Sequence, residues 1–177
     1  MRARVQLVCF AAGVAAAAPL CAQRTRSVEV VPGQITRVVS DTMGTPYPVP
    51  FPRAQTYRAL LAVYDDLKLP AEARDSVAGQ VGVVSFYRRG DFAGRQISAW
   101  LSCGDSVTGP NADNYRVYMY LMSVIAPAGE GAVTVRTVLM AGAVNVTEGA
   151  RQAMPCESTG RLEVFIHKRL LAKAAGL

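Results

Sequence analysis

The sequence predicts an α+β fold, a two-layer sandwich in which helices cover one face of an antiparallel sheet. Three observations lead to this prediction. Apolar residues recur at helical spacing from residue 54, strict alternation marks a strand over 115–124, and a second strand over 132–146 follows a turn at 127–131. Two such strands joined by a short loop form an antiparallel hairpin. The full order is hairpin, helix, strand, short helix, hairpin and helix, which is typical of the α+β class.

The N-terminal residues have the pattern of a secretory signal peptide. Arg2 and Arg4 give a basic start, Val5–Leu20 is an almost unbroken apolar run, and a small residue, Ala22, stands at the expected cut. The run of about 16 residues is shorter than the ~20 that a membrane span needs. We therefore expect residues 1–22 to be a signal peptide, and the mature chain to be exported to the periplasm or the outside of the cell.

Anchoring of the mature chain through a lipid on Cys21 stays open at this point. A small residue is expected just before a lipidated cysteine, whereas Leu20 stands there. No later segment is apolar over a sufficient length to span a bilayer, so any membrane association, for example with the outer membrane, would not be a spanning one.

The charge of the chain is small and dispersed. Loss of Arg2 and Arg4 with the leader lowers the formal net charge from +6 to +4, without blocks of basic residues. Nucleic acid is therefore not expected as a partner, and an anionic lipid or glycan stays an alternative.

Cys103 and Cys156 are the cysteines outside the expected leader. Two cysteines in an oxidising compartment usually pair, so we predict a disulfide between them. The alternative is that Cys103 is a nucleophile with His167 as its base, as in a thiol-dependent or hydrolytic enzyme. A catalytic cysteine must stay reduced, and no third residue is placed to orient the histidine. The sequence therefore favours the disulfide.

After the leader, residues 23–52 are expected to form an N-terminal hairpin and a proline-rich extended segment, and residues 53–177 a single α+β domain. Pro32-Gly33 is a good hairpin turn between two β-rich segments. Prolines at alternate positions from Pro46 to Pro52 predict an extended, polyproline-like connector, because proline fixes φ and lacks a donor. The hairpin strands are expected over 28–31 and 35–39.

Periodicity and composition predict the elements of the larger domain. A helix with an apolar stripe ends at Pro70, a β-rich strand covers 80–88, a short helix covers 96–103, and a loop covers 104–114. The chain closes with a helix from Leu162, although alternating apolar residues there leave a strand as the alternative. The stripe of the first helix comprises Tyr57, Leu60, Leu61, Tyr64 and Leu67.

The strand over 115–124 divides its side chains between two faces. Tyrosine and arginine are favoured at the energetic centres of protein interfaces, so the face that carries them is the candidate binding face. This face is either solvated, covered by the N-terminal hairpin and the proline segment, or occupied by a partner. Its residues are Arg116, Tyr118, Tyr120 and Met122; the face expected to meet the helices carries Tyr115, Val117, Met119 and Leu121.

The sequence contains no pattern typical of a catalytic or cofactor site. It has no Gly-rich phosphate loop, no Gly-x-Ser-x-Gly turn and no His-x-x-x-His pair. One histidine and two paired cysteines cannot build the usual zinc site. We therefore predict no catalytic residue, no cofactor and no metal. His167 is expected on the exposed side of the last helix, and Trp100 is expected to pack against the disulfide.

The layout of the chain resembles the helix-grip arrangement. A helix with Tyr57, Leu60-Leu61 and Tyr64, followed by a strand, a hairpin and a terminal helix, is similar in outline to domains of the BamC type of outer-membrane assembly lipoprotein. Cys103-Gly104 and the segment Cys156–Glu163 resemble motifs of uncharacterised exported proteins of Gram-negative bacteria. This resemblance implies a non-catalytic role in the cell envelope.

The sequence therefore predicts an exported, non-catalytic envelope domain that binds a protein or an envelope component. The alternative is the thiol-dependent or hydrolytic enzyme that would use Cys103 and His167. The oligomeric state is left open.

Overall fold

The computed structural model describes residues 25–129, 131–146 and 152–177. Over these residues the protein is a mixed structure dominated by antiparallel sheet, with 47% strand and 24% helix. The antiparallel sheet and the presence of both helices and strands are confirmed. The predicted signal peptide and Cys21 lie outside the described residues.

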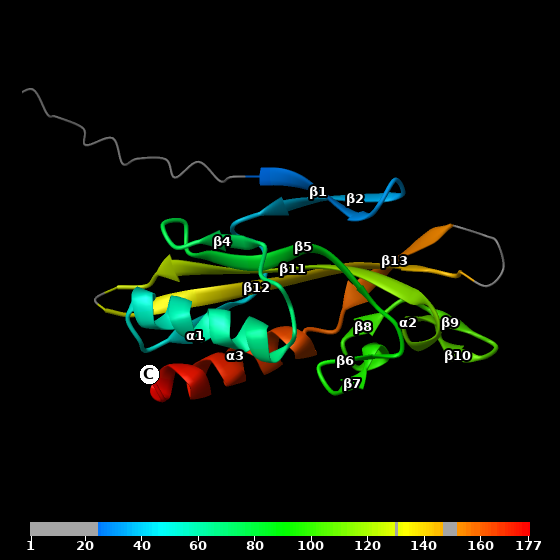
Figure 1. Ribbon diagram of the computed structural model, residues 1–177. Coiled ribbons are helices and arrows are strands. Elements are labelled where there is room, and N and C mark those ends of the chain that lie inside the picture. Colours follow the sequence, from blue (N-terminus) through cyan, green and yellow to red (C-terminus); the bar gives the residue numbers. More distant parts are fainter. Residues whose placement is uncertain (1–24, 130, 147–151) are drawn as a thin grey trace, which may run out of the picture.

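A seven-stranded sheet forms the centre of the structure (Figure 1). Six strands follow the order β4-β5-β11-β12-β13-β8, and β3 pairs with β12 on the same side as β13. The predicted hairpin of β11 and β12 is confirmed, with a continuous register from Arg116↔Val144 to Pro127↔Val133. The strands are β3 (Pro46–Val49), β4 (Ala73–Asp75), β5 (Gln80–Arg88), β8 (Leu101–Ser102), β11 (Arg116–Pro127), β12 (Val133–Val144) and β13 (Ala153–Ser158).

The other described elements are helices and two-stranded hairpins. The helices are α1 (Arg53–Asp66), α2 (Asn111–Asn114), α3 (Arg161–Ala175) and a 3-10 turn (Ile97–Ala99). The hairpins are β1 (Thr25–Val31) with β2 (Ile35–Ser40), β6 (Asp91–Phe92) with β7 (Arg95–Gln96), and β9 (Asp105–Ser106) with β10 (Gly109–Pro110). None of the described helices is long and apolar enough to cross a membrane.

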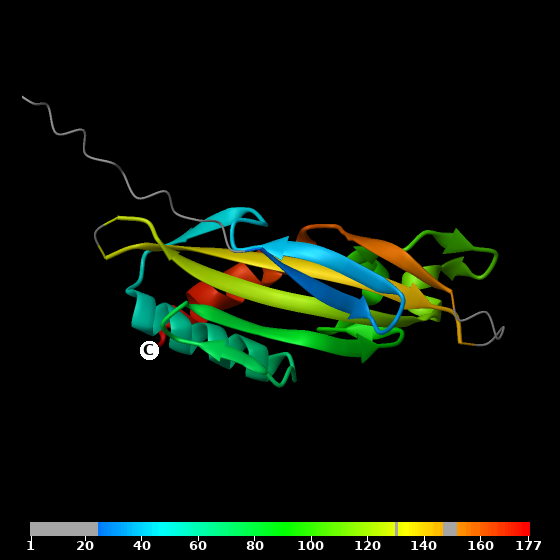
Figure 2. The ribbon, with the colours of Figure 1, turned by 90° about the horizontal axis from the view of Figure 1, so that it is seen from above.

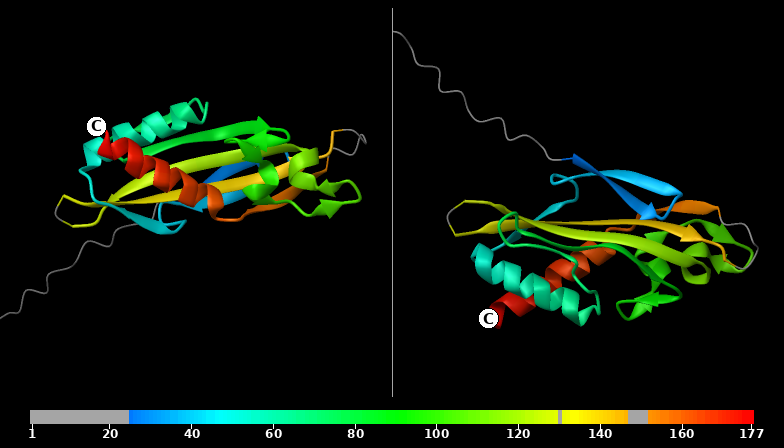
Figure 3. Two further views of the ribbon diagram at one scale, coloured as in Figure 1. Left: turned by 90° about the horizontal axis from the view of Figure 1, so that it is seen from below. Right: turned by 45° about the horizontal axis from the view of Figure 1, so that its top comes forward.

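The helices α1 and α3 pack together and against the sheet, as the view from below shows (Figure 3). Leu60 and Tyr64 of α1 and Leu162 and Ile166 of α3 are fully buried in the same core as Met119 of β11. The helical spacing in the sequence therefore predicts the buried side of α1 correctly. The last segment is a helix, which resolves the alternative of a strand.

The hairpin of β1 and β2 lies on the opposite side of the sheet and makes a separate apolar core there (Figure 2). Val28 and Val30 of β1 are buried with Tyr120 and Met122 of β11. Because the hairpin is a sheet of its own, it is attached by side chains and not by a strand ladder. A two-layer sandwich therefore does not describe the structure, since the hairpin adds a further layer, which was one of the alternatives for this face.

Specific contacts hold the hairpin in place on the sheet. Arg26 Nη2 donates to the Tyr120 hydroxyl at 2.6 Å, and the Gln34 side-chain oxygen accepts from the Ala153 amide at 2.7 Å. Gly142 of β12 allows a close approach, because a Cβ at this position would lie 2.5 Å from Val31 Cγ2. These contacts therefore fix the position of the hairpin on the sheet.

The proline segment is extended, as predicted, but part of it forms strand β3 rather than a polyproline-like connector. β3 pairs with β12 from Val49↔Val133 to Pro46↔Arg136. Alternate residues of a strand direct their nitrogens to the same side. The donors to β12 therefore come from Tyr47 and Val49, while the nitrogens of Pro46 and Pro48 face away from the ladder, where proline is tolerated.

Short elements differ most from the prediction. Residues 96–103 contain a 3-10 turn and β8 instead of a short helix, and the expected loop 104–114 contains β9, β10 and α2. β13 was not predicted. These elements are only two to six residues long, which is too short for local periodicity to reveal them.

Candidate functional site

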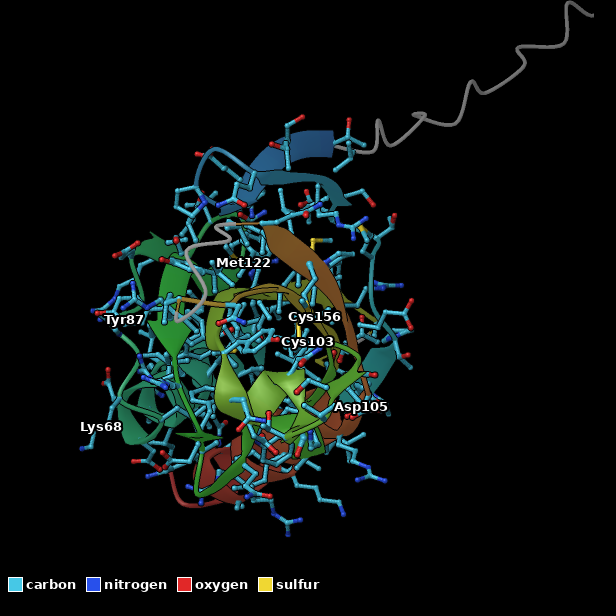
Figure 4. The ribbon with its side chains drawn as sticks, turned by 90° about the vertical axis from the view of Figure 1, so that its right-hand side faces the viewer. Lys68, Tyr87, Cys103, Asp105, Met122 and Cys156 are labelled. Atoms are coloured by element: carbon cyan, nitrogen blue, oxygen red, sulfur yellow. A yellow bond between two sulfur atoms is a disulfide. The ribbon has the colours of Figure 1, made fainter. Side chains whose placement is uncertain are left out.

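The structure divides the predicted binding face into a covered and an accessible part. Tyr120 and Met122 are 0% and 2% exposed beneath the β1–β2 hairpin. Figure 4 shows Met122 on the side of the sheet that the hairpin covers. Tyr118 and Arg116, nearer the start of β11, are only half-buried. Three alternatives were open for this face, and at Tyr120 and Met122 the structure shows that the hairpin covers it.

The accessible part gains an aromatic partner from β5. Tyr87 is 57% exposed and stands opposite Tyr118 in the ladder, with their ring centroids 5.9 Å apart. The Arg116 guanidinium carbon lies 5.0 Å from the Tyr87 ring centroid. We call Tyr87, Arg116 and Tyr118 the Tyr-Arg cluster. Figure 4 shows Tyr87 at the outer side of the molecule.

Arg116 is the charged member of the Tyr-Arg cluster. A hydrogen bond with the Tyr118 side chain raises the pKa of Arg116, so the guanidinium stays charged. Within the described parts of the chain it forms no ion pair, since the ion pairs found there join Asp66 to Arg169 and Lys173. A guanidinium on an aromatic ring keeps donors for a carboxylate or phosphate.

A groove of about 450 Å³ adjoins the cluster at the tip of the hairpin. Arg116 and Tyr118 line it from the sheet, and Val31 and Pro32 line it from the hairpin. Val146, which is 44% exposed, follows β12 and adds apolar surface. The groove thus combines aromatic, aliphatic and cationic groups, which is the composition that interface centres favour.

The predicted disulfide between Cys103 and Cys156 is confirmed. It links the segment after β8 to β13, and both residues are buried (Figure 4). Cys103 therefore carries no thiol in this structure. Cys156 is opposite Ala141 of β12, whereas Tyr47, which contacts His167, is opposite Val135. These two positions on β12 are six residues apart, which corresponds to about 20 Å along a strand. The disulfide and the residue that contacts His167 therefore lie at different parts of the β12 edge.

The sequence predicted His167 on the exposed side of α3, and this prediction is wrong. Its ring is stacked on Tyr47 with centroids 4.9 Å apart, and the residue is half-buried. Desolvation by this burial lowers the pKa of His167 below its ordinary value. The sequence missed the contact because Tyr47 belongs to β3, which was not expected to join the sheet.

Trp100 is a buried core residue with a hydrogen-bonded indole. It is 4% exposed, its indole N–H donates to the Phe92 carbonyl at 2.8 Å, and its ring is tilted against Phe165 of α3 at 5.5 Å. Its partners are thus the Phe92 carbonyl and the partly buried Phe165 ring, and it belongs to the same apolar core as Cys103 and Cys156.

The described residues contain no group of three or more His, Cys, Asp or Glu side chains that could hold a metal ion. Comparison of the chain with protein-family models, with curated proteins and with solved structures finds no match. The resemblance to helix-grip domains and to exported proteins of Gram-negative bacteria therefore stays a prediction. The candidate site is the Tyr-Arg cluster with its groove.

Proposed function

We propose that this protein is an exported, non-catalytic domain of the cell envelope that binds a protein or envelope component through the Tyr-Arg cluster. The observation that carries the proposal is the geometry of Tyr87, Arg116 and Tyr118. Two accessible tyrosines and an arginine without an ion-pair partner among the described residues adjoin a groove of about 450 Å³. Tyrosine and arginine are enriched among the few residues that carry most of the binding energy at protein interfaces.

Export is supported by two independent features. The signal-peptide pattern of residues 1–22 directs a chain out of the cytoplasm, and the Cys103–Cys156 bond is of a kind that persists mainly in oxidising compartments. A disulfide is compatible with the periplasm and with the outside of the cell.

A binding role rather than a chemical one is supported by the state of the candidate catalytic pair. The disulfide occupies Cys103, and His167 is stacked on Tyr47 at a different part of the β12 edge. A thiol-dependent reaction would first need a reductant that opens this bond.

The proposal is tested by photo-crosslinking in the native envelope. A crosslinker placed on an added residue near the cluster would capture partners of the wild-type protein and of a Tyr87→Ser/Arg116→Gln variant. We expect the partner of the wild-type protein to disappear from the variant, because loss of an interface centre costs about 2 kcal/mol or more, roughly 30-fold in affinity. Both residues are accessible, so the variant is expected to stay folded.

The matched controls are Val77→Ala and Val107→Ala, which remove the most exposed aliphatic side chains, at 90% and 106% exposure, away from the cluster. These variants are expected to capture the same partner as the wild-type protein. Equal capture by the cluster variant and the controls would contradict the proposed surface.

A further inference from the structure

The edge of β12 has a gap between the two strands that pair with it. β3 covers residues 133–136 and β13 covers residues 141–144. Residues 137–140 between them have no strand partner on this side in the described part of the chain. A cavity of about 210 Å³ lies at this gap, between the segments that lead into β3 and into α3.

Several polar side chains contribute to the wall of this cavity. Thr45, Tyr47, Thr137, Ser158 and Glu163 line it together with two glycines. One carboxylate oxygen of Glu163, Oε1, accepts a hydrogen bond from Ser158 Oγ at 2.6 Å. The other oxygen, Oε2, is buried and has no hydrogen-bond partner among the described residues. A buried carboxylate oxygen without a partner is costly, because burial removes its hydration.

A second unpartnered atom lies on the same side of α3. His167 follows Glu163 by one helical turn, which places the two side chains on one face. The His167 ring is stacked on Tyr47, itself part of the cavity wall, and its Nδ1 atom is buried without a partner among the described residues. Burial lowers the pKa of His167, so the imidazole is neutral at pH 7 and one nitrogen is an acceptor.

The charge of the cavity wall is negative. Glu163 is its one formally charged side chain at neutral pH. Arg136 directly precedes Thr137 of the cavity wall, but its two neighbours, Val135 and Thr137, lie on the helix side of β12. Its side chain therefore leaves the sheet on the other side.

We propose that this cavity binds a primary ammonium group, as carried by a lysine side chain or an amino sugar. An ammonium has one positive charge and three donors, which match the charge and the unpartnered oxygen of the Glu163 carboxylate and the hydroxyl oxygens of Thr45 and Ser158. A divalent cation fits less well, because Ca²⁺ takes six to eight oxygen ligands, usually with several carboxylates. This site is separate from the Tyr-Arg cluster, so the two proposals stand independently.

The test is an NMR titration of the oxidised, ¹⁵N-labelled protein. The probes are the lysine analogue Nα-acetyl-lysine methylamide and glucosamine, each compared with its N-acetylated, uncharged form. We expect saturable shifts of the Thr45, Ser158 and Gly160 amides with the free amines, and none with the acetylated forms. Binding by only one of the two amines supports the proposal and identifies the source of the ammonium.

Variants locate the effect at the carboxylate. Glu163→Gln keeps an acceptor for Ser158 but removes the charge, and we expect at least a tenfold weaker affinity. The control Glu157→Gln removes the charge of an exposed carboxylate on β13 and should leave the affinity unchanged.

Three results would each overturn the proposal: equal shifts with the amines and their acetylated forms, no saturable shift, or unchanged binding by Glu163→Gln. The cavity would then be a site that holds water and no ammonium group. The comparison of amine with acetylated probe uses the wild-type protein, so it does not depend on whether the variant folds.

Discussion

A buried chain of three hydroxyl groups joins α1 to the two central strands. The Tyr64 hydroxyl lies 3.1 Å from Ser123 Oγ, which lies 2.8 Å from Thr137 Oγ1. All three residues are at most 4% exposed. Each hydroxyl therefore depends on its neighbours for hydrogen bonding, and Ser123 serves both of the others.

We expect Ser123→Ala to destabilise the protein more than Tyr64→Phe. Tyr64→Phe removes a terminal hydroxyl and leaves Ser123 bonded to Thr137, so it should cost one net hydrogen bond, about 1 kcal/mol. Ser123→Ala leaves two buried hydroxyls without this partner, each at about 1–3 kcal/mol, and we expect about 3 kcal/mol in total. For a chain of this size that lowers Tm by roughly 6–12 °C.

The assay is urea unfolding of the oxidised protein, followed by circular dichroism. The double variant Tyr64→Phe/Ser123→Ala should cost less than the sum of the single variants, because it no longer leaves the phenol unpaired. Ser85→Ala, at an exposed serine of β5, is the matched control and should stay within about 0.5 kcal/mol of the wild type. A cost for Ser123→Ala no greater than that of Tyr64→Phe would refute the reasoning.

Two further predictions concern the disulfide and the buried phenols. Cys103→Ala/Cys156→Ala should lower the free energy of unfolding by about 4 kcal/mol in the chain-entropy model for this loop, and a change below about 1 kcal/mol would show that the bond constrains little. Burial raises the pKa of Tyr64 and of Tyr120. Their contribution to stability is therefore complete below pH ~10, where the unfolded phenols ionise, and is lost as the pH rises beyond it. Absorbance titration should show that Tyr64→Phe and Tyr120→Phe each remove a phenol that ionises at higher pH than a free tyrosine, and removal of an ordinary phenol by either variant would contradict this.

Periodicity predicts the elements that form most of the main core. The strand expected over 80–88 is β5 with both bounds correct, and the alternation of 115–124 assigns Met119 and Tyr120 to opposite sides of the sheet. Both signals are local, since each depends on how side chains follow one another along a single strand. β13 was missed because its strand character depends on pairing with β12 and with β8, the second of which lies far away in the chain.

The candidate site was predicted only in part, for a related reason. The alternation of β11 places Tyr118 and Tyr120 on one face, but it does not determine which of them the hairpin covers. Which tyrosine is covered depends on where the hairpin packs, and this position is set by the close approach of Val31 to Gly142, a tertiary contact. Tyr87 joins the cluster through the register of β5 with β11, and that register shifts between Met119 and Leu121, an irregularity that local periodicity does not reveal.

The two prolines of β3 also determine how the sheet can meet other chains. A strand that docks onto an edge needs both N–H donors and carbonyl acceptors along that edge. On the outward side of β3, Pro46 and Pro48 provide carbonyl oxygens but no donors. A foreign strand would therefore leave its own acceptors unpaired there. Among unfolded chains with free strand edges, β3 therefore resists adventitious association, because its prolines lack the donors that an added strand would need.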